Sequence, residues 1–310
     1  MKGIKKFLNE IFIDGLSGMA LGLFATLIIG TIICQLGSLI GGDVGAYLTA
    51  MGNVAKSLTG AGIGVGVASK LKSGPLVTVA AAVTGMIGAF PTVMTMEGFA
   101  IGKPGEPLGA FVAAIVGIKL GQLVSGKTKV DIIITPLVSI FTGAMVGFFV
   151  GPPITTFMTW LGELVNVNVE QYPVIGGIIV SVLMGMILTL PISSAAIGVS
   201  MGITGLAAGA ATVGCCCNMV GFAVASYREN KMGGLIAQGV GTSMLQVPNI
   251  VKKPIIWLPA ILSSAILGPI ASAVLKMVSN PVGSGMGSAG FVGQISAYTS
   301  MVEAGTDKVM

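Results

Sequence analysis

The stretch IFIDGLSGMALGLFATLIIGTIICQLGSLI, residues 11–40, contains Asp14 as its single charged side chain. A helix needs about 20 predominantly apolar residues to cross the hydrocarbon core of a bilayer. The stretch is longer than one crossing, so we predict a first transmembrane helix that is kinked at its glycines or begins in the interface. This segment decides the fold class, because a backbone in lipid must satisfy its own hydrogen bonds and an α-helix does so.

The composition of the whole chain agrees with that of this stretch. Of 310 residues, 54% are hydrophobic and only 9% are charged, whereas a soluble domain usually carries about 25% charged residues. The mean hydropathy is +0.97, and the 48 glycines would allow helices to approach closely within a membrane. We therefore predict an all-α, polytopic transmembrane helical bundle whose solvent is the lipid bilayer.

Further apolar stretches predict about nine or ten membrane-embedded segments. Residues 192–227 indicate one span preceded by a broken or re-entrant piece, and residues 233–248 are short enough for a re-entrant hairpin. Residues 151–173 alternate apolar and polar positions in a way that is typical of an amphipathic helix lying along the interface. The remaining predicted spans cover residues 46–68, 74–96, 108–124, 132–150, 174–190 and 255–278.

The distribution of charge predicts the orientation in the membrane. The net charge is +5, and the basic residues are scattered over the N-terminus and short loops. By the positive-inside rule, these loops and the N-terminus face the cytoplasm, although the side of residues 228–231 depends on how residues 192–227 cross. The N-terminal MKGIKKFLNE predicts a retained first helix rather than a cleaved leader. Scattered charge with few aromatic residues argues against nucleic acid as a partner.

A weak internal similarity predicts a duplicated bundle. The segment VASKLKSGPLV, residues 67–77, resembles VASYRENKMGGLI, residues 224–236. We predict a first membrane repeat over residues 1–165, ending in the interfacial helix, and a second over residues 166–310 with Gly-rich broken helices. Together they form one integral membrane domain, with a site at the repeat interface as in many transporters. The alternative is chance similarity between spans rich in Gly and Ala.

Enzymatic chemistry has little support in the sequence. Histidine is absent, which removes the usual general base and the commonest metal ligand at neutral pH. Phosphate-binding loops and hydrolase motifs are absent as well. The adjacent Cys215, Cys216 and Cys217 would point about 100° apart on a helix and could not all face one ion. We therefore expect no enzyme, no cofactor and no metal site, with these cysteines as small buried side chains.

Polar side chains inside apolar segments are the candidate ligand contacts, because such groups are costly in lipid. Asn218 lies within a long apolar run. The segment QGVGTSMLQVPNI, residues 238–250, adds glycines and a proline that favour irregular backbone, which lines cavities at membrane depth. Neutral amides and hydroxyls suit an uncharged, polyhydroxylated solute. The alternative is hydrogen bonding between helices. The candidates from these two segments are Asn218, Gln238, Ser243, Gln246 and Asn249.

Two further candidates come from other segments. Gln294 lies in the Gly-rich segment at residues 280–300, which is either a hairpin tip or a flexible loop. Lys56 interrupts an apolar segment, where it is either a functional residue or a side chain that extends to the interface. Glu97 and Glu106 flank Pro104, and for both we favour a solvated loop over a loop folded into a cavity.

Three runs of the sequence resemble a known family: TLPISSAAIG, GAATVGCCCNMVGFAVASYRENKMGGLIAQGVGTSMLQVPNI and NPVGSGMGSAGFVGQI. They are similar to the enzyme IIC-like membrane proteins of the phosphotransferase sugar-transport system, in the branch also called the perfringolysin (toxin) regulator family. The resemblance covers most of the chain. It implies a multi-pass permease of the bacterial inner membrane that works as a homodimer and translocates a small polar solute, a sugar or sugar derivative, by alternating access.

The sequence also departs from the well-known sugar permeases that it resembles. It lacks their site histidine and their GITPE-type motif, and no phosphocarrier domain is fused to the chain. If transport is coupled to phosphorylation, separate soluble phosphocarrier subunits must supply the phosphate. The alternative function is a membrane sensor or regulator of gene expression that keeps the permease fold and does not transport, because fold alone does not determine function.

Overall fold

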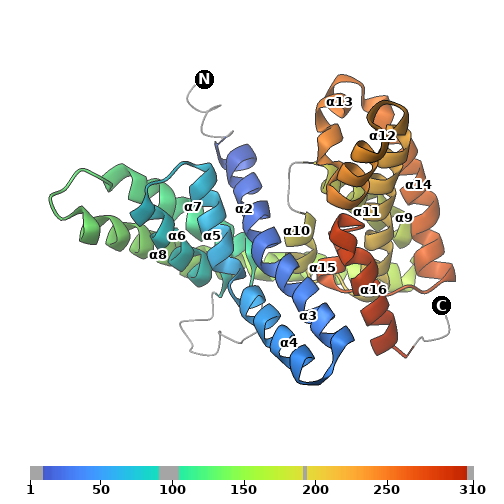
Figure 1. The fold of residues 1–310 in the computed structure, drawn as a ribbon, viewed down its shortest axis with the longest axis horizontal. Coiled ribbons are helices and arrows are strands. Elements are labelled where there is room, and N and C mark those ends of the chain that lie inside the picture. The colour runs from blue at the N-terminus through green and yellow to red at the C-terminus, as the bar shows by residue number, and fades with distance from the viewer. Residues whose placement is uncertain (1–9, 91–104, 191–193, 306–310) are drawn as a thin grey trace. The chain divides into compact units, whose positions relative to one another are not determined.

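A computed structural model describes residues 10–90, 105–190 and 194–305 (Figure 1). Within these ranges the chain is helical and forms no strand, apart from one isolated bridge between Gly205 and Ser279. The predicted all-α class is confirmed. The predictions that concern Glu97 and residues 191–193 lie outside the described residues.

The chain divides into two compact units, Met1–Phe157 and Met158–Met310, which we call the N-terminal and C-terminal units. The division lies close to the predicted boundary after residue 165. Compactness alone says nothing about common ancestry or symmetry, so the two membrane repeats stay a prediction.

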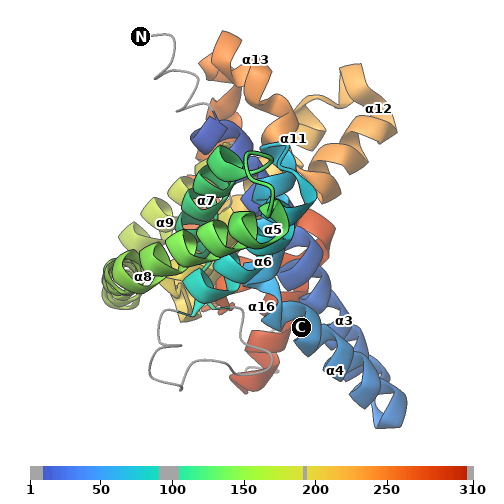
Figure 2. The ribbon, with the colours of Figure 1, turned by 90° about the vertical axis from the view of Figure 1, so that its left-hand side faces the viewer.

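The described part of the N-terminal unit begins with one long helix, in which two π-helical stretches alternate with two α-helical ones. The wider winding of a π-helical stretch often marks a bend. The four elements follow one another without a gap, so the predicted long first segment is one continuous helix. The next helix returns beside its end, and the two form a hairpin (Figures 1 and 2). The elements are η1 (Glu10–Gly15), α2 (Leu16–Leu23), η2 (Phe24–Ile28), α3 (Ile29–Ile40) and α4 (Gly42–Ser57).

The core of the N-terminal unit is made by three helices that pack on one another, and the first of them also packs on α2: α5 (Thr59–Lys70), α6 (Pro75–Ala89) and α7 (Pro107–Val124). Their contacts bury Ile63, Val77 and Ile118 completely. The span predicted at residues 46–68 is two helices, because the backbone of Leu58 leaves helical geometry between α4 and α5.

One prediction about the middle of the chain is wrong. The sequence suggested a span at residues 132–150 and a separate amphipathic helix after it, but α8 (Asp131–Gln171) runs through both without a break. Pro152 and Pro153 lie inside it. Proline disturbs a helix by removing a donor, yet its fixed φ near −65° is also the helical value, and here the helix continues.

The C-terminal unit is centred on three helices that pack against one another, α9 (Pro173–Thr189), α11 (Gly205–Ala225) and α14 (Leu258–Pro269). Before α11 lies the short α10 (Ser194–Met201), as predicted for a broken piece ahead of a span. The chain between α11 and α14 is irregular, as the glycines and prolines suggested. It comprises α12 (Tyr227–Ile236), η4 (Ala237–Gly241), η5 (Ser243–Gln246), α13 (Val247–Lys252) and η6 (Pro254–Trp257).

The last part of the chain is short helices rather than an open loop. After η7 (Ile270–Val274) come α15 (Pro281–Ser284), η8 (Ala289–Phe291) and α16 (Val292–Glu303). Gln294 therefore lies in the first turn of a regular helix. The alternative of a flexible loop for residues 280–300 does not hold.

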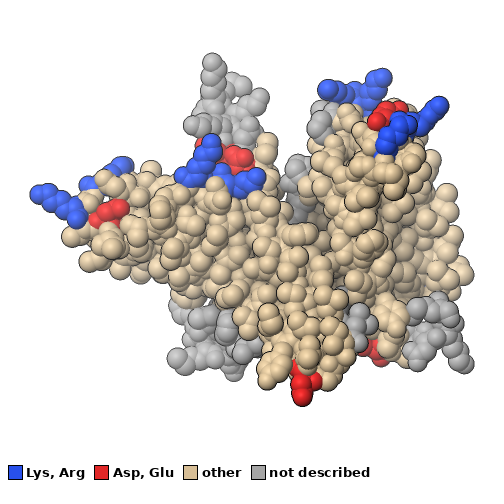
Figure 3. Space-filling view, viewed as in Figure 1, with Lys and Arg blue, Asp and Glu red and all other residues tan. Residues whose placement is uncertain are grey.

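Five helices among the described residues are long and apolar enough to cross a membrane, and two shorter apolar helices accompany them. On the visible face in Figure 3, charged side chains gather at the ends of the units and leave the long sides almost free of charge. Such a charge-free band suits lipid as the solvent. The five long segments are Glu10–Ser38, Pro107–Val124, Asp131–Gln171, Gly205–Ala225 and Pro254–Val274.

Candidate functional site

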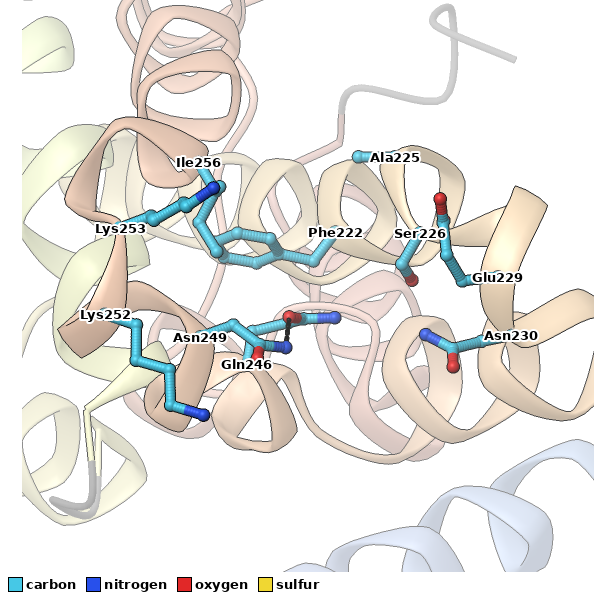
Figure 4. A pocket seen from close by; sticks show the side chains of 10 residues that line it. All are labelled: Phe222, Ala225, Ser226, Glu229, Asn230, Gln246, Asn249, Lys252, Lys253 and Ile256. Atoms are coloured by element: carbon cyan, nitrogen blue, oxygen red, sulfur yellow. Dashed lines mark hydrogen bonds between the residues drawn. The ribbon is translucent and has the colours of Figure 1, made fainter.

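A pocket of about 540 Å³ opens at one end of the C-terminal unit (Figure 4). It forms where α11 ends and the chain turns into α12, with η5, α13 and η6 closing the other side. Irregular backbone therefore surrounds the pocket, as expected for a cavity at the edge of a helical core. The lining residues are Phe222, Ala225, Ser226, Glu229, Asn230, Gln246, Asn249, Lys252, Lys253 and Ile256.

The base of the pocket is apolar. Phe222 is buried with Ile250 and Ala260, and Ile256 and Trp257 pack against this cluster. The contacts join the last turns of α11 to the start of α14. An apolar base with a few polar groups around it is typical of a small-molecule site.

A relay of side-chain hydrogen bonds forms the polar part of the pocket. Asn249 donates from Nδ2 to Gln246 Oε1 (2.9 Å), and Gln246 donates from Nε2 to Gln238 Oε1 (2.7 Å). Gln238 in turn donates from Nε2 to Ser226 Oγ (2.8 Å). Gln238 and Gln246 are buried, whereas Asn249 is exposed at the pocket. The relay fixes the orientation of each amide and links the end of α11 to η4, η5 and α13.

Charged side chains surround the opening of the pocket. Figure 4 shows Lys252 and Lys253 on one side, and Ser226, Glu229 and Asn230 on the other. Two ammonium groups against one carboxylate leave the opening with a net positive charge, which favours approach of polar or anionic molecules.

A second polar cluster lies inside the core beside the pocket. Asn218 is fully buried, and its Nδ2 donates to Gly214 O (3.1 Å) and Ser264 Oγ (3.2 Å). Its Oδ1 accepts from Trp257 Nε1 (2.9 Å) and Thr189 Oγ1 (3.4 Å). These partners come from α9, α11, η6 and α14, so one amide joins four elements.

The structure thus divides the seven predicted contact residues into two groups and two further residues. Gln238, Gln246 and Asn249 meet in the pocket relay. Asn218 and Ser243 belong to the buried cluster, where the hydroxyl groups of Ser243 and Thr189 are 3.0 Å apart. The other two residues, Gln294 and Lys56, are in neither group.

Gln294 and Lys56 each have a local contact instead. Gln294 is exposed on α16, and its Nε2 lies 3.7 Å from Cys216 Sγ. Lys56 belongs to α4 of the N-terminal unit, where it is half-buried and its side chain packs close to Gly30 of α3. Neither residue is among those that line the pocket.

Sequence reasoning missed several lining residues. The sequence patterns assigned these residues to a predicted span, to the internal repeat or to the basic loops that orient the chain. They are Phe222, Ser226, Glu229, Asn230, Lys252 and Lys253. The signal that could have identified them is the return of charged and amide residues directly after α11 and again directly before α14, because consecutive helices place such residues at one end of a bundle.

The expectation of a solvated loop at Glu106 is wrong. This side chain is buried and caps the N-terminus of α7, accepting a hydrogen bond from the backbone N–H of Leu108 (3.0 Å) and another from Gly109. A carboxylate at this position satisfies amides that have no partner within the helix. Glu106 therefore has a structural role in the N-terminal unit.

The three adjacent cysteines have different surroundings. Cys215 is buried, with its Sγ 3.5 Å from Met184 O and 3.4 Å from Ser284 O, whereas Cys216 faces Gln294. Over the residues that the structure describes, three or more Cys, Asp or Glu side chains never gather as a metal site would require.

Comparison with known proteins gives one result that covers nearly the whole chain. The family model described as "Phosphotransferase system, EIIC" matches residues 13–309. No curated protein matches the sequence.

Proposed function

We propose that this chain, which belongs to the phosphotransferase system EIIC family, translocates a small polar solute of the sugar class by alternating access. The family gives the coarser part of this statement: the chain is a multi-pass membrane protein and the permease-type component of a phosphotransferase system. The solute class and the transport cycle are our proposal.

The observation that carries the proposal is the pocket in the C-terminal unit. Its volume of about 540 Å³ is that of a small-molecule site. Its amide relay offers neutral donors and acceptors at fixed orientations, beside the apolar ring of Phe222. Sugars have hydroxyl groups that exchange hydrogen bonds with amides and C–H faces that pack on aromatic rings, so the lining suits this class of solute.

The charges around the pocket support an orientation. Arg228, Lys231, Lys252 and Lys253 border the pocket end of the C-terminal unit, and by the positive-inside rule this end faces the cytoplasm. We propose that the N-terminus is cytoplasmic as well, in the inner membrane of a bacterium. Separate soluble phosphocarrier subunits would reach the solute from this side, and two copies of the chain would form the working homodimer.

The predicted repeats gain support from the backbone. In each of the two similar segments, VAS lies at the end of a core helix, α5 or α11, and a lysine with positive φ follows: Lys72 at 52° and Lys231 at 50°. Non-glycine residues adopt this conformation rarely. Lys72 follows Ser69 by three residues and Lys231 follows Ser226 by five, and we take this partial likeness as support for two membrane repeats, over residues 1–165 and 166–310, with the pocket in the second.

The first test is binding and uptake with the pure protein. Thermal stability in detergent is measured against sugars, sugar phosphates, polyols and vitamins, since a ligand bound only by the folded state stabilises it by about 2.7 kcal/mol at 100 times its dissociation constant. Asn249→Ala and Gln246→Ala should each weaken binding of the active solute about tenfold, the effect of one or two lost hydrogen bonds. Asn168→Ala is the matched control, because this exposed amide donates only to Leu164 O of its own helix.

The outcomes separate transport from sensing. Saturable uptake of the bound solute into liposomes supports a permease. Binding without uptake favours the alternative, a sensor or regulator built on the same fold. Unchanged binding in both pocket variants contradicts the site, and no ligand from any of the four classes contradicts the solute class.

A further inference from the structure

Three short pieces of chain carry one wall of the pocket. Gln246 is the last residue of η5, and Asn249 lies in α13. Lys253 directly precedes η6, and Ile256 lies within it. Pieces of four to six residues have few internal hydrogen bonds, so their position depends on contacts with the core. Segments of this kind open locally at lower free energy than the helices around them.

Two of those contacts meet at Asn218. Trp257, the last residue of η6, donates from Nε1 to Asn218 Oδ1 (2.9 Å). Ser243, the first residue of η5, is 3.0 Å from the hydroxyl of Thr189, which donates to the same oxygen (3.4 Å). Trp257 is therefore bonded directly to the amide oxygen of Asn218, whereas Ser243 is joined to it through the hydroxyl of Thr189, which is also 3.3 Å from Gly185 O within α9.

The same amide is fixed on its other side. Its nitrogen donates to Gly214 O within α11 and to Ser264 Oγ on α14, and Ser264 also donates to Ala260 O (2.9 Å). Asn218, Thr189, Ser243 and Ser264 are all buried. A polar network that is satisfied in a low-dielectric interior is strong, and cutting one bond leaves a buried group without its partner.

We propose that Asn218 is a positioning residue that ties both ends of the pocket wall, residues 243–257, to the α9–α11–α14 core and thereby sets the affinity of the pocket for its solute. The inference rests on the proposed function for the identity of the site. It differs from the sequence-based hypothesis that Asn218 touches the solute, because both N–H groups and the oxygen of Asn218 already bind protein groups in this structure.

The variants cut each tie at residues outside the pocket lining, and Trp257 reaches the pocket only through the apolar cluster at its base. Trp257→Phe removes the indole N–H and keeps an aromatic ring in the apolar cluster. Thr189→Val removes the hydroxyl and keeps the shape. Trp160→Phe is the matched control, since it makes the same change at the only other tryptophan of the chain, which is exposed on α8.

Hydrogen–deuterium exchange gives a readout that needs no ligand. Backbone amides in residues 243–257 should exchange about fivefold to tenfold faster in Trp257→Phe and in Thr189→Val than in the unmodified protein, as expected for the loss of one buried hydrogen bond. Amides of α9 and α11 should be unchanged. Affinity for the solute should fall by a similar factor in both variants, with the maximal uptake rate kept.

Each arm can overturn the inference by itself. Equal exchange in the variants and in Trp160→Phe means that Asn218 does not hold the wall. Faster exchange throughout α9, α11 and α14 means a general loss of stability instead of a local tie. Faster exchange over residues 243–257 with unchanged affinity means that the wall does not set binding. If the unmodified protein binds no solute, the proposed function fails, and the exchange arm still decides whether Asn218 is the tie.

Discussion

At the scale of single residues, the buried serines of the C-terminal unit differ in whether their hydroxyl groups have a hydrogen-bond partner among the described residues. Ser264 is fully buried, donates to Ala260 O and accepts from Asn218 Nδ2. Ser279 and Ser296 are also buried, but the described residues provide no hydrogen-bond partner for either side chain. Both pack closely against Gly283, where an added Cβ would lie 2.5 Å from Ser279 Oγ and 2.6 Å from Ser296 Cβ.

Replacing these serines should have opposite effects on stability. Ser264→Ala should lower the free energy of unfolding by about 1–2 kcal/mol, because Asn218 loses a buried partner. Ser296→Ala should leave it unchanged or raise it by up to about 1 kcal/mol, because an unpaired hydroxyl is costly to bury. Unfolding in detergent measures both effects.

Ser263→Ala is the control for this pair, since Ser263 donates only to Pro259 O of its own helix. A clear loss of stability in Ser296→Ala would contradict the prediction. It would mean that the Ser296 hydroxyl has a hydrogen-bond partner, as buried polar groups usually do.

At the scale of secondary-structure elements, the close approach of α9 and α11 depends on glycine. A Cβ at Gly214 of α11 would overlap the backbone of Ser181 on α9, including its carbonyl oxygen. Small residues at such contacts let two backbones touch, which is the usual way that helices associate in membranes. Gly221, farther along the same helix, has its nearest neighbour at 3.6 Å, the Cβ of Ala260.

Alanine at these two positions should therefore behave differently. Gly214→Ala should destabilise the protein by about 2–3 kcal/mol, since backbone cannot move aside as a side chain can. Gly221→Ala should be neutral or stabilise by up to about 1 kcal/mol, because alanine favours the helix over the unfolded chain. Thermal unfolding of the two variants checks this, and equal melting temperatures would contradict the close contact.

At the scale of the whole molecule, charge predicts how each unit lies in the membrane. Lys70 ends α5 and Lys72 follows it, whereas Asp43 lies in the first turn of α4, at the tip of the α3–α4 hairpin, which points away from the end of α5 (Figure 1). Arg228 and Lys231 follow α11 in the same way in the C-terminal unit. The positive-inside rule then predicts that both lysine turns are cytoplasmic and that Asp43 is outside.

Cysteine labelling tests this orientation. In intact cells a membrane-impermeant maleimide should label Asp43→Cys, and should label Lys72→Cys and Lys231→Cys only after the membrane is permeabilised. The unmodified chain, whose four cysteines are buried or half-buried, gives the background. Labelling of Lys72→Cys and Lys231→Cys from opposite sides would contradict the common orientation and would mean that the two similar segments are inverted.

The sequence by itself determined the fold class and most helix positions, because length and hydropathy decide whether a segment can lie in lipid. It also identified the short piece ahead of the span in residues 192–227, seen as α10, and the irregular backbone that begins within residues 233–248, since glycine and proline act through local backbone geometry. It failed at α8, where no local signal showed that Pro152 and Pro153 would be kept within one helix.

The candidate site depended far more on tertiary structure. Sequence reasoning pointed to Gln238, Gln246 and Asn249, because an amide in an apolar segment needs a partner wherever it lies, and the structure joins these three at the pocket while their contact with a solute stays a prediction. Only packing decided that Asn218 would find its partners on α9, η6 and α14 instead of facing the pocket, and that Lys252, Lys253 and Glu229 would meet at one opening. The cost of burying a polar group is a property of the residue, whereas the group that offsets this cost comes from elements far away in the chain.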